Sequence, residues 1–208
     1  MSEKKIKRKV IKIGLLGDSK VGKTAICNSF LNIDFHEIAL STIGSEKLES
    51  KIKIKNGEEI KLSIYDTAGQ ERFHSIALKA IRVVQGVIIV FDLTNTESFQ
   101  HVINWLNGIY ENFNKKVSIV LFGNKSDINK SEWKITEEEA IQFAKEKNLP
   151  YFETSAKLNK NIKEGFEKVV NDAYDLCEGS CGVSLEDVKK GDKKRCCGGK
   201  NKNGNPND

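Results

Sequence analysis

Residues 17–24 read Gly17-Asp18-Ser19-Lys20-Val21-Gly22-Lys23-Thr24, between an apolar run, Val10 to Leu16, and an amphipathic run, Lys23 to Leu31. The segment matches G-x-x-x-x-G-K-[ST], a pattern in which glycines let backbone N–H groups turn inward around a phosphate. The N-terminus of the following helix favours the same negative charge. We therefore predict a strand, a phosphate-binding loop and a helix, in that order. The motif by itself indicates only a nucleoside triphosphate.

Two side chains of this loop carry its expected chemistry. Lys23 would place its positive charge on the outer phosphates, and Thr24 would offer its hydroxyl to Mg²⁺. A chance turn before a helix is the alternative interpretation of the motif. The strand and the helix that flank it argue against that alternative.

Apolar strand-like runs alternate with helical ones over the rest of the chain. Gly86 to Asp92 and Val117 to Gly123 are continuous apolar runs that end in polar turns, which is typical of parallel strands buried on both faces. Leu48 to Lys55 and Ile60 to Tyr65 instead alternate apolar and polar residues around the turn sequence NGEE. This alternation indicates an antiparallel hairpin.

Helical periodicity fills the gaps between these strands. Residues 96–113 predict one helix, Thr136 and Glu139 form a capping box that starts another, and a last helix runs from about Asn161 to Cys177. We predict a single doubly wound α/β domain over residues 10–177, with ligands at the carboxyl ends of its strands. We expect residues 1–9 to be an N-terminal extension and residues 178–208, rich in Gly, Lys, Asn and Ser, to be a flexible tail.

Composition excludes several classes of protein. The chain has 208 residues, 38% of them hydrophobic and 30% charged, with a net charge of +5, as expected of a soluble globular protein. No basic patch is interleaved with aromatic residues, so nucleic-acid binding is not expected. No apolar run approaches the ~20 residues that span a bilayer. The five cysteines fit a reducing cytosol, and the three scattered histidines predict no structural metal.

Further polar motifs follow other predicted strands. Asp66-Thr67-Ala68-Gly69-Gln70 ends the second hairpin strand, and its acid suits an indirect Mg²⁺ contact while Gln70 could orient water. Asn124-Lys125-Ser126-Asp127 ends another strand. The Asp127 carboxylate would accept from N1–H and N2–H₂ of guanine, a pattern that adenine lacks. Ser155-Ala156-Lys157 follows the last strand and can close this base pocket.

These segments, in this order and spacing, resemble the Ras superfamily of small GTPases over about Val10 to Cys177, and most closely its Rab branch. The resemblance implies a six-stranded, mostly parallel sheet with helices on both faces. It also implies that the cofactors are GTP or GDP and Mg²⁺. The nucleotide-binding residues implied are Ser19, Lys20, Val21, Gly22, Lys23, Thr24, Ala25, Phe35, Thr42, Gly69, Asn124, Lys125, Asp127, Ser155, Ala156 and Lys157.

The resemblance assigns roles at the phosphates. Thr24 and Thr42 ligate Mg²⁺, and Asp66 holds the ion through water. Gly69 contacts the γ-phosphate, and Gln70 is the catalytic residue that positions the attacking water. The rate magnitudes usually quoted for such phosphoryl transfer come from members of this family itself.

The resemblance also assigns roles around the base. Phe35 packs against it, Asn124 and Asp127 read guanine, and Lys125 lines the base. Ala156 offers its backbone N–H to the guanine O6.

Several positions depart from the Rab pattern. Ser45-Glu46-Lys47 stands where V-D-F is typical, Tyr65 stands where a Trp is usual, and residues 74–86 lack the paired tyrosines. Lys20 stands where Gly is frequent, and we interpret it as a solvated loop lysine. The departures fall on the surface that partners read, so nucleotide chemistry is expected to be intact while partner identity is not indicated.

The resemblance implies a GTP-driven molecular switch in vesicle-mediated transport. Its partners would be an exchange factor, an activating protein and effectors, and we expect a monomer that does not bind nucleic acid. It would cycle between the cytosol and the cytosolic face of an intracellular membrane. The alternative is a scaffold that holds nucleotide without turning it over. A nucleotide kinase is disfavoured by the N-K-x-D segment and by the lack of an acceptor lid.

Two neighbouring cysteines, Cys196 and Cys197, follow a basic run in the tail. A disulfide between neighbours is strained, because consecutive α-carbons are only ~3.8 Å apart. The Rab resemblance implies that such a pair carries two geranylgeranyl chains, although eleven residues follow Cys197 here. We expect lipidation and membrane association at this pair. An unmodified reactive pair is the alternative.

Overall fold

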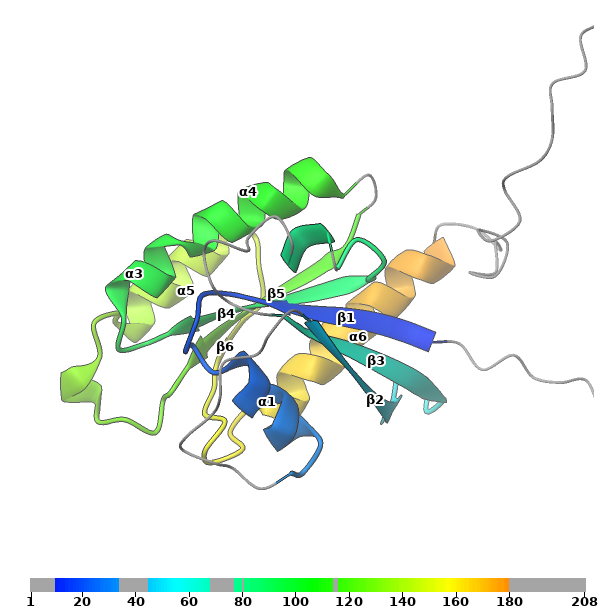
Figure 1. Cartoon of the computed structure of the whole chain (residues 1–208), viewed down its shortest axis with the longest axis horizontal. Helices are drawn as coiled ribbons and strands as arrows, with labels where there is room; N and C mark the ends of the chain where they lie inside the picture. The colour runs from blue at the N-terminus through cyan, green and yellow to red at the C-terminus, as the bar shows by residue number, and fades with distance from the viewer. Residues whose placement is uncertain (1–9, 34–44, 68–76, 80, 114–115, 180–208) are drawn as a thin grey trace, which may run out of the picture.

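The computed structural model describes residues 10–33, 45–67, 77–79, 81–113 and 116–179. Its elements follow one another along the chain as strands that alternate with helices after an initial hairpin (Figure 1). They are β1 (Val10–Leu16), α1 (Lys23–Phe30), β2 (Ser45–Lys53), β3 (Glu59–Thr67), β4 (Gly86–Asp92), α3 (Thr96–Gln100), α4 (Val102–Asn112), β5 (Ser118–Asn124), the 3-10 helix η2 (Lys130–Glu132), α5 (Glu137–Glu146), β6 (Tyr151–Glu153) and α6 (Ile162–Gly179).

The six strands form one sheet in the order β2-β3-β1-β4-β5-β6. Every neighbouring pair is parallel except β2 and β3, which form the antiparallel hairpin predicted from their alternation. Because β1 lies between β3 and β4, the chain leaves β1 toward one side of the sheet and later returns on the other. Ligands in such sheets bind at the carboxyl ends of the strands beside this reversal.

Helices cover both faces of the sheet, as Figure 1 shows: α1 and α6 lie on one face, and α3, α4 and α5 lie on the other. Each face buries its own apolar cluster, one around Ile64, Phe122 and Phe166 and the other around Leu16 and Trp105. The doubly wound α/β fold is therefore confirmed. Within the described ranges, no helix is long and apolar enough to cross a bilayer.

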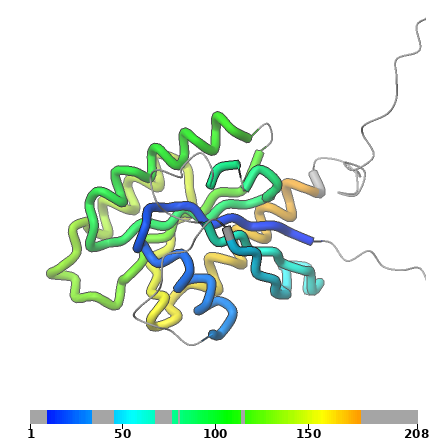
Figure 2. Tube along the Cα trace, viewed as in Figure 1, coloured from blue at the N-terminus to red at the C-terminus, as the bar shows by residue number. Residues whose placement is uncertain are grey.

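The ends of the described chain lie on one side of the molecule. In Figures 1 and 2, the start of β1 and the end of α6 are neighbours at the right. The loop that follows β1 lies at the other end of that strand (Figure 2). Helix α6 therefore ends on the side opposite the phosphate loop.

The helix predicted over residues 96–113 is wrong in one respect, because it is divided into α3 and α4. The residue between them, His101, keeps helical dihedral angles (φ −72°, ψ −12°). Asn95 caps α3 by accepting from the Ser98 N–H at 3.2 Å, so the chain turns sharply where β4 ends. The last helix also continues to Gly179, two residues beyond the predicted Cys177.

Helix α6 packs unusually close to β5. A β-carbon built on Gly165 would lie 2.2 Å from Cζ of Phe122, whose ring is fully buried. Phe122 also contacts Phe152 and Phe166 in edge-on geometry, with ring centroids 6.0 Å and 6.4 Å away. The ring therefore has little room to yield, and residue 165 must be Gly for α6 to reach this position.

Replacing Gly165 by Ala should destabilise the fold although Ala favours helices. The helix gains ~1 kcal/mol from the change, but the overpacked core costs about 1–3 kcal/mol. We expect a net loss of about 1 kcal/mol in the free energy of unfolding, measured by urea denaturation. The matched change Glu164→Ala, on the exposed face, should stay within about 0.5 kcal/mol of the wild type. A more stable Gly165→Ala protein would contradict the close packing.

Candidate functional site

The loop after β1 is shaped by two glycines at positive φ. Gly17 has φ 139°, and a β-carbon there would lie 2.1 Å from the carbonyl oxygen of Val90 in β4. Gly22 has φ 100° and forms the N-cap of α1. Lys20 is exposed and also has positive φ, 66°, a conformation that favours Gly. The sequence therefore builds a tight turn at the position where the motif predicts a phosphate-binding loop.

Lys23 lies under this loop, with only 6% of its surface exposed. Its Nζ donates to the carbonyl oxygens of Gly17, at 2.9 Å, and Asp18, at 2.7 Å. Burial lowers the pKa of Lys23 to about 8, against the opposing effects of the Asp66 and Asp18 carboxylates. A buried ammonium held by two carbonyls at the start of a helix is a ready binding site for phosphate.

Thr24 and Asp66 meet beside the lysine. The Thr24 hydroxyl donates to Oδ2 of Asp66 at 2.5 Å, and the carboxylate is completely buried at the end of β3. Hydroxyl and carboxylate oxygens are the hard donors that Mg²⁺ prefers. Among the described residues no group of three or more His, Cys, Asp or Glu side chains is placed to hold a metal ion. Magnesium is usually held by one or two carboxylates together with substrate phosphates, so these two side chains fit it.

A second loop, after β5, is joined to the phosphate loop by Asn124. Its Nδ2 donates to the Val21 carbonyl at 2.8 Å, and its Oδ1 accepts from the Ala156 N–H at 3.3 Å. Asn124 is 2% exposed. One buried amide therefore fixes three loops, those after β1, β5 and β6, at the same edge of the sheet.

The remaining polar groups of this edge surround the expected base position. Ser155 donates its hydroxyl to Oδ1 of Asp127 at 2.6 Å, which orients the carboxylate. The ammonium of Lys125, a residue with φ 69°, lies 2.5 Å from Oδ2 of Asp92. Sequence analysis missed Asp92; its only signal is that it is the polar residue that ends an apolar strand.

The other predicted site residues divide into two groups. Ser19 and Ala25 are partly buried in the loop and the first turn of α1, and Lys157 is exposed after β6. The described residues that are predicted to bind phosphate, magnesium and the base thus lie at one edge of the sheet. Outside the described residues lie Phe35, Thr42, Gly69, Gln70, Cys196 and Cys197.

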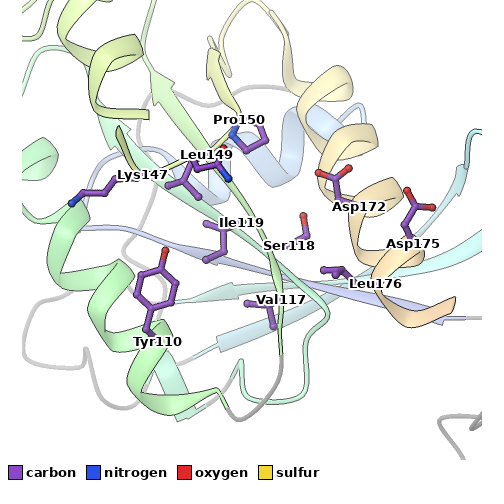
Figure 3. Close-up of a pocket in the computed structure, with 11 residues that line it drawn as sticks. Tyr110, Val117, Ser118, Ile119, Lys147, Leu149, Pro150, Asp172, Asp175 and Leu176 are labelled. Atoms are coloured by element: carbon purple, nitrogen blue, oxygen red, sulfur yellow. The ribbon is translucent and has the colours of Figure 1, made fainter. Parts of the chain in front are cut away.

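A hollow of about 740 Å³ lies elsewhere, at the amino end of β5. Figure 3 shows Tyr110 of α4 on one side, Asp175 and Leu176 of α6 on the other, and Ser118 at the start of β5 between them. It shares no lining residue with the phosphate loop. We therefore place the candidate site at the carboxyl ends of the strands, where the polar groups converge.

Comparisons with known proteins agree with this geometry. The model of the Ras family matches residues 12–175. The chain is 39% identical over 163 residues to the Ras-related protein Rab-13 of Canis lupus familiaris, covering 78% of this chain and 79% of the relative. It is 40% identical over 165 residues to Rab-10 of Diplobatis ommata, covering 78% and 80%. It is 37% identical over 155 residues to Rab-15 of Homo sapiens, covering 74% and 72%.

The lowered pKa of Lys23 predicts that nucleotide binding takes up a proton. Without phosphate the pKa is about 8, so the side chain is mostly neutral above that pH. A bound phosphate favours the charged form and raises the pKa, so affinity for GDP should fall as pH rises above about 8.

Calorimetric titration with GDP in two buffers of different ionisation enthalpy checks this. At about pH 8.5 the binding heat should depend on the buffer in the sense of proton uptake. Near pH 7, where Lys23 is mostly charged in both states, the uptake should shrink. Identical heats in both buffers at the higher pH would show that Lys23 is already charged before binding.

Proposed function

The chain belongs to the Ras family of small GTPases, within its Rab branch, and we propose that the edge described above is its magnesium-dependent guanine-nucleotide site. As a Rab-like GTPase it hydrolyses GTP and acts in vesicle trafficking. The observation that carries the proposed site is the convergence of Lys23, the Thr24–Asp66 pair and the Asp127–Ser155 pair on one edge.

The phosphates are proposed to lie over α1. Lys23 would donate to β- and γ-phosphate oxygens and would keep part of its hydrogen bonding to the Gly17 and Asp18 carbonyls. Thr24 and Asp66 would hold Mg²⁺, with Thr42 as a further ligand. When bound, the ion neutralises negative charge on the phosphates. The short hydrogen bond between Thr24 and Asp66 supports this, because it holds the two oxygen atoms that would face the ion next to each other.

The base is proposed to lie between the loops after β5 and β6. Asp127 would accept from N1–H and N2–H₂ of guanine, with its orientation set by Ser155. Lys125 would line the base, and its ion pair with Asp92 supports a fixed position for it. The Ala156 N–H, which lies 3.3 Å from Asn124 Oδ1, would be shared with guanine O6. Phe35 would cover the base.

Asp127→Asn should change the preferred base from guanine to xanthine. Xanthine has a carbonyl where guanine has its 2-amino group, and an amide can donate to it whereas a carboxylate cannot. We expect competition assays to show at least roughly 100-fold weaker GDP binding and a gain in xanthosine diphosphate binding, because both hydrogen bonds to the guanine edge are lost.

Asp175→Asn is the matched control, because that carboxylate lies exposed on α6, in the lining of the distant hollow. It should bind GDP as the wild type does. Wild-type protein that binds ATP as tightly as GTP would refute the base pocket.

The switch itself is proposed to act through residues beyond the described ones. Thr42 and Gly69 would be held by Mg²⁺ and the γ-phosphate in the GTP form, which orders the segments around them, and hydrolysis would release both. Gln70 would position the attacking water. Effectors, an exchange factor and an activating protein would distinguish the two states. Family membership disfavours the alternative of a scaffold that holds nucleotide without turnover.

Gln70→Leu should slow hydrolysis while leaving GTP affinity within about twofold, because the residue acts on the attacking water and not on the bound ground state. Single-turnover hydrolysis and nucleotide-binding assays measure the two quantities separately. Gln142→Leu makes the same change on the exposed face of α5 and should alter neither. Equal single-turnover rates for Gln70→Leu and wild type would remove this residue from the mechanism.

Membrane association is proposed to depend on Cys196 and Cys197. Two lipid chains give stable anchoring where one does not. The basic residues just before the pair add ~1 kcal/mol each near an anionic surface. Helix α6 ends on the side opposite the phosphate loop (Figure 1), which supports attachment to a membrane that does not block the nucleotide site.

Replacing both cysteines by Ser should move the protein from the membrane fraction of its own cells to the cytosolic fraction. Intact mass spectrometry should show two lipid groups on the wild type and none on this variant. Cys181→Ser, in the same tail, is the matched control and should leave both results unchanged. A wild-type protein with free thiols at both positions would end the lipid proposal.

A further inference from the structure

Asp18, the second residue of the phosphate loop, bonds to two side chains far away in the sequence. His101 Nδ1 lies 2.6 Å from its Oδ2, and Trp105 Nε1 donates to its Oδ1 at 3.0 Å. An ionised carboxylate only accepts, so the proton of the first bond is on the histidine nitrogen. Both carboxylate oxygens are therefore used by the segment at the start of α4.

The helix geometry explains how both donors reach one carboxylate. His101 and Trp105 are four residues apart, and His101 keeps helical dihedral angles, so the two side chains lie on the same face. His101 occupies the N-cap position of α4 but makes no capping bond with its side chain. Its ring is instead hydrogen-bonded to Asp18 in the phosphate loop.

Trp105 makes this contact rigid. Only 2% of its surface is exposed, and its indole lies in the apolar cluster with Leu16 at the end of β1. A buried indole N–H needs an acceptor, because leaving it without one destabilises the fold. Asp18 provides an acceptor for it, so the core of the α4 face is bonded directly to the loop.

The same residue is also held through its main chain. The Asp18 carbonyl accepts from Nζ of Lys23 at 2.7 Å. The side chain of Asp18 is thus bonded to α4 while its backbone orients the lysine proposed to bind phosphate. A carboxylate in this loop would repel a phosphate through space. Its two N–H donors stabilise the carboxylate in this position.

We infer that His101 and Trp105 are positioning residues for the nucleotide: by fixing Asp18, they hold the Lys23 ammonium and the phosphate loop in the binding conformation. Helix α4 thereby controls how fast nucleotide leaves, although it contributes no group to the site itself. The inference rests on the proposed function, because it assumes that this loop binds guanine nucleotide.

The test is the rate of GDP dissociation, followed with a fluorescent GDP analogue on the full chain with Mg²⁺ present. Trp105→Phe removes one N–H and keeps most of the apolar bulk, and His101→Leu removes the other donor. Each should speed dissociation roughly 3- to 10-fold, the effect of one lost hydrogen bond. His101→Asn keeps a donor near the Nδ1 position and should stay within about 2-fold of the wild type.

Two controls separate this role from a general effect on stability. Trp133→Phe makes the same substitution at the other tryptophan, which donates to the Ile128 carbonyl, and should leave the rate unchanged. Asp18→Asn combined with Trp105→Phe should be less than additive, because both changes act on the same bond. The Trp133→Phe protein retains Trp105 as its only tryptophan. Its emission should change when GDP is removed.

Each outcome decides between two conclusions. GDP dissociation at the wild-type rate from folded Trp105→Phe and His101→Leu proteins would overturn the positioning role. Equally accelerated GDP dissociation from His101→Asn and His101→Leu would do the same. If Trp105→Phe fails to fold, the half-exposed His101 and its pair of variants still decide. A wild-type protein that binds no guanine nucleotide would refute the proposed function itself, and that result is distinct from the others.

Discussion

The arrangement of the site depends on the hydrogen bonds made by the side-chain amide of Asn124. It is almost fully buried and bonds to the Val21 carbonyl on one side and the Ala156 N–H on the other. Without it, the carbonyl and the N–H would each lose a buried partner, at a cost of about 1–3 kcal/mol for each group. The phosphate loop and the loops after β5 and β6 are therefore one structure, and protein bonds fix the separation between the proposed phosphate and base positions.

The order of strands explains why chemistry collects at this edge. β1 is central, and its residue Leu15 is in register with Asp66 of β3. On the other side, Asp92 of β4 is in register with Asn124 of β5. Because these strands are parallel, their polar carboxyl ends meet on both sides of the phosphate loop. The buried positive charge of Lys23 lies among these groups, where its neighbours Asp66 and Asp18 partly offset the cost of burial.

Local signals predicted much of this from the sequence. The apolar runs predicted β1 and β4 with their observed bounds, and the capping box formed by Thr136 and Glu139 starts α5 as predicted. The contacts of Asp18 with His101 and Trp105 could not be predicted, because they join residues more than 80 positions apart. The pairing of Asp92 with Lys125 was not predicted either, because these residues lie on different strands and loops. Such pairs depend on how distant helices, strands and loops pack together, which local sequence patterns do not predict.

The assembly of the site from distant strands also has a consequence for the kinetics of folding. Lys23, Asp66, Asn124 and Ser155 lie on four segments that meet only when the sheet is complete. Partly folded chains thus present no nucleotide site, and a ligand that binds only the native state stabilises that state alone. Contacts absent from the transition state slow unfolding and leave the folding rate unchanged. Bound nucleotide should therefore slow unfolding, so that the lifetime of the native protein increases with the concentration of nucleotide.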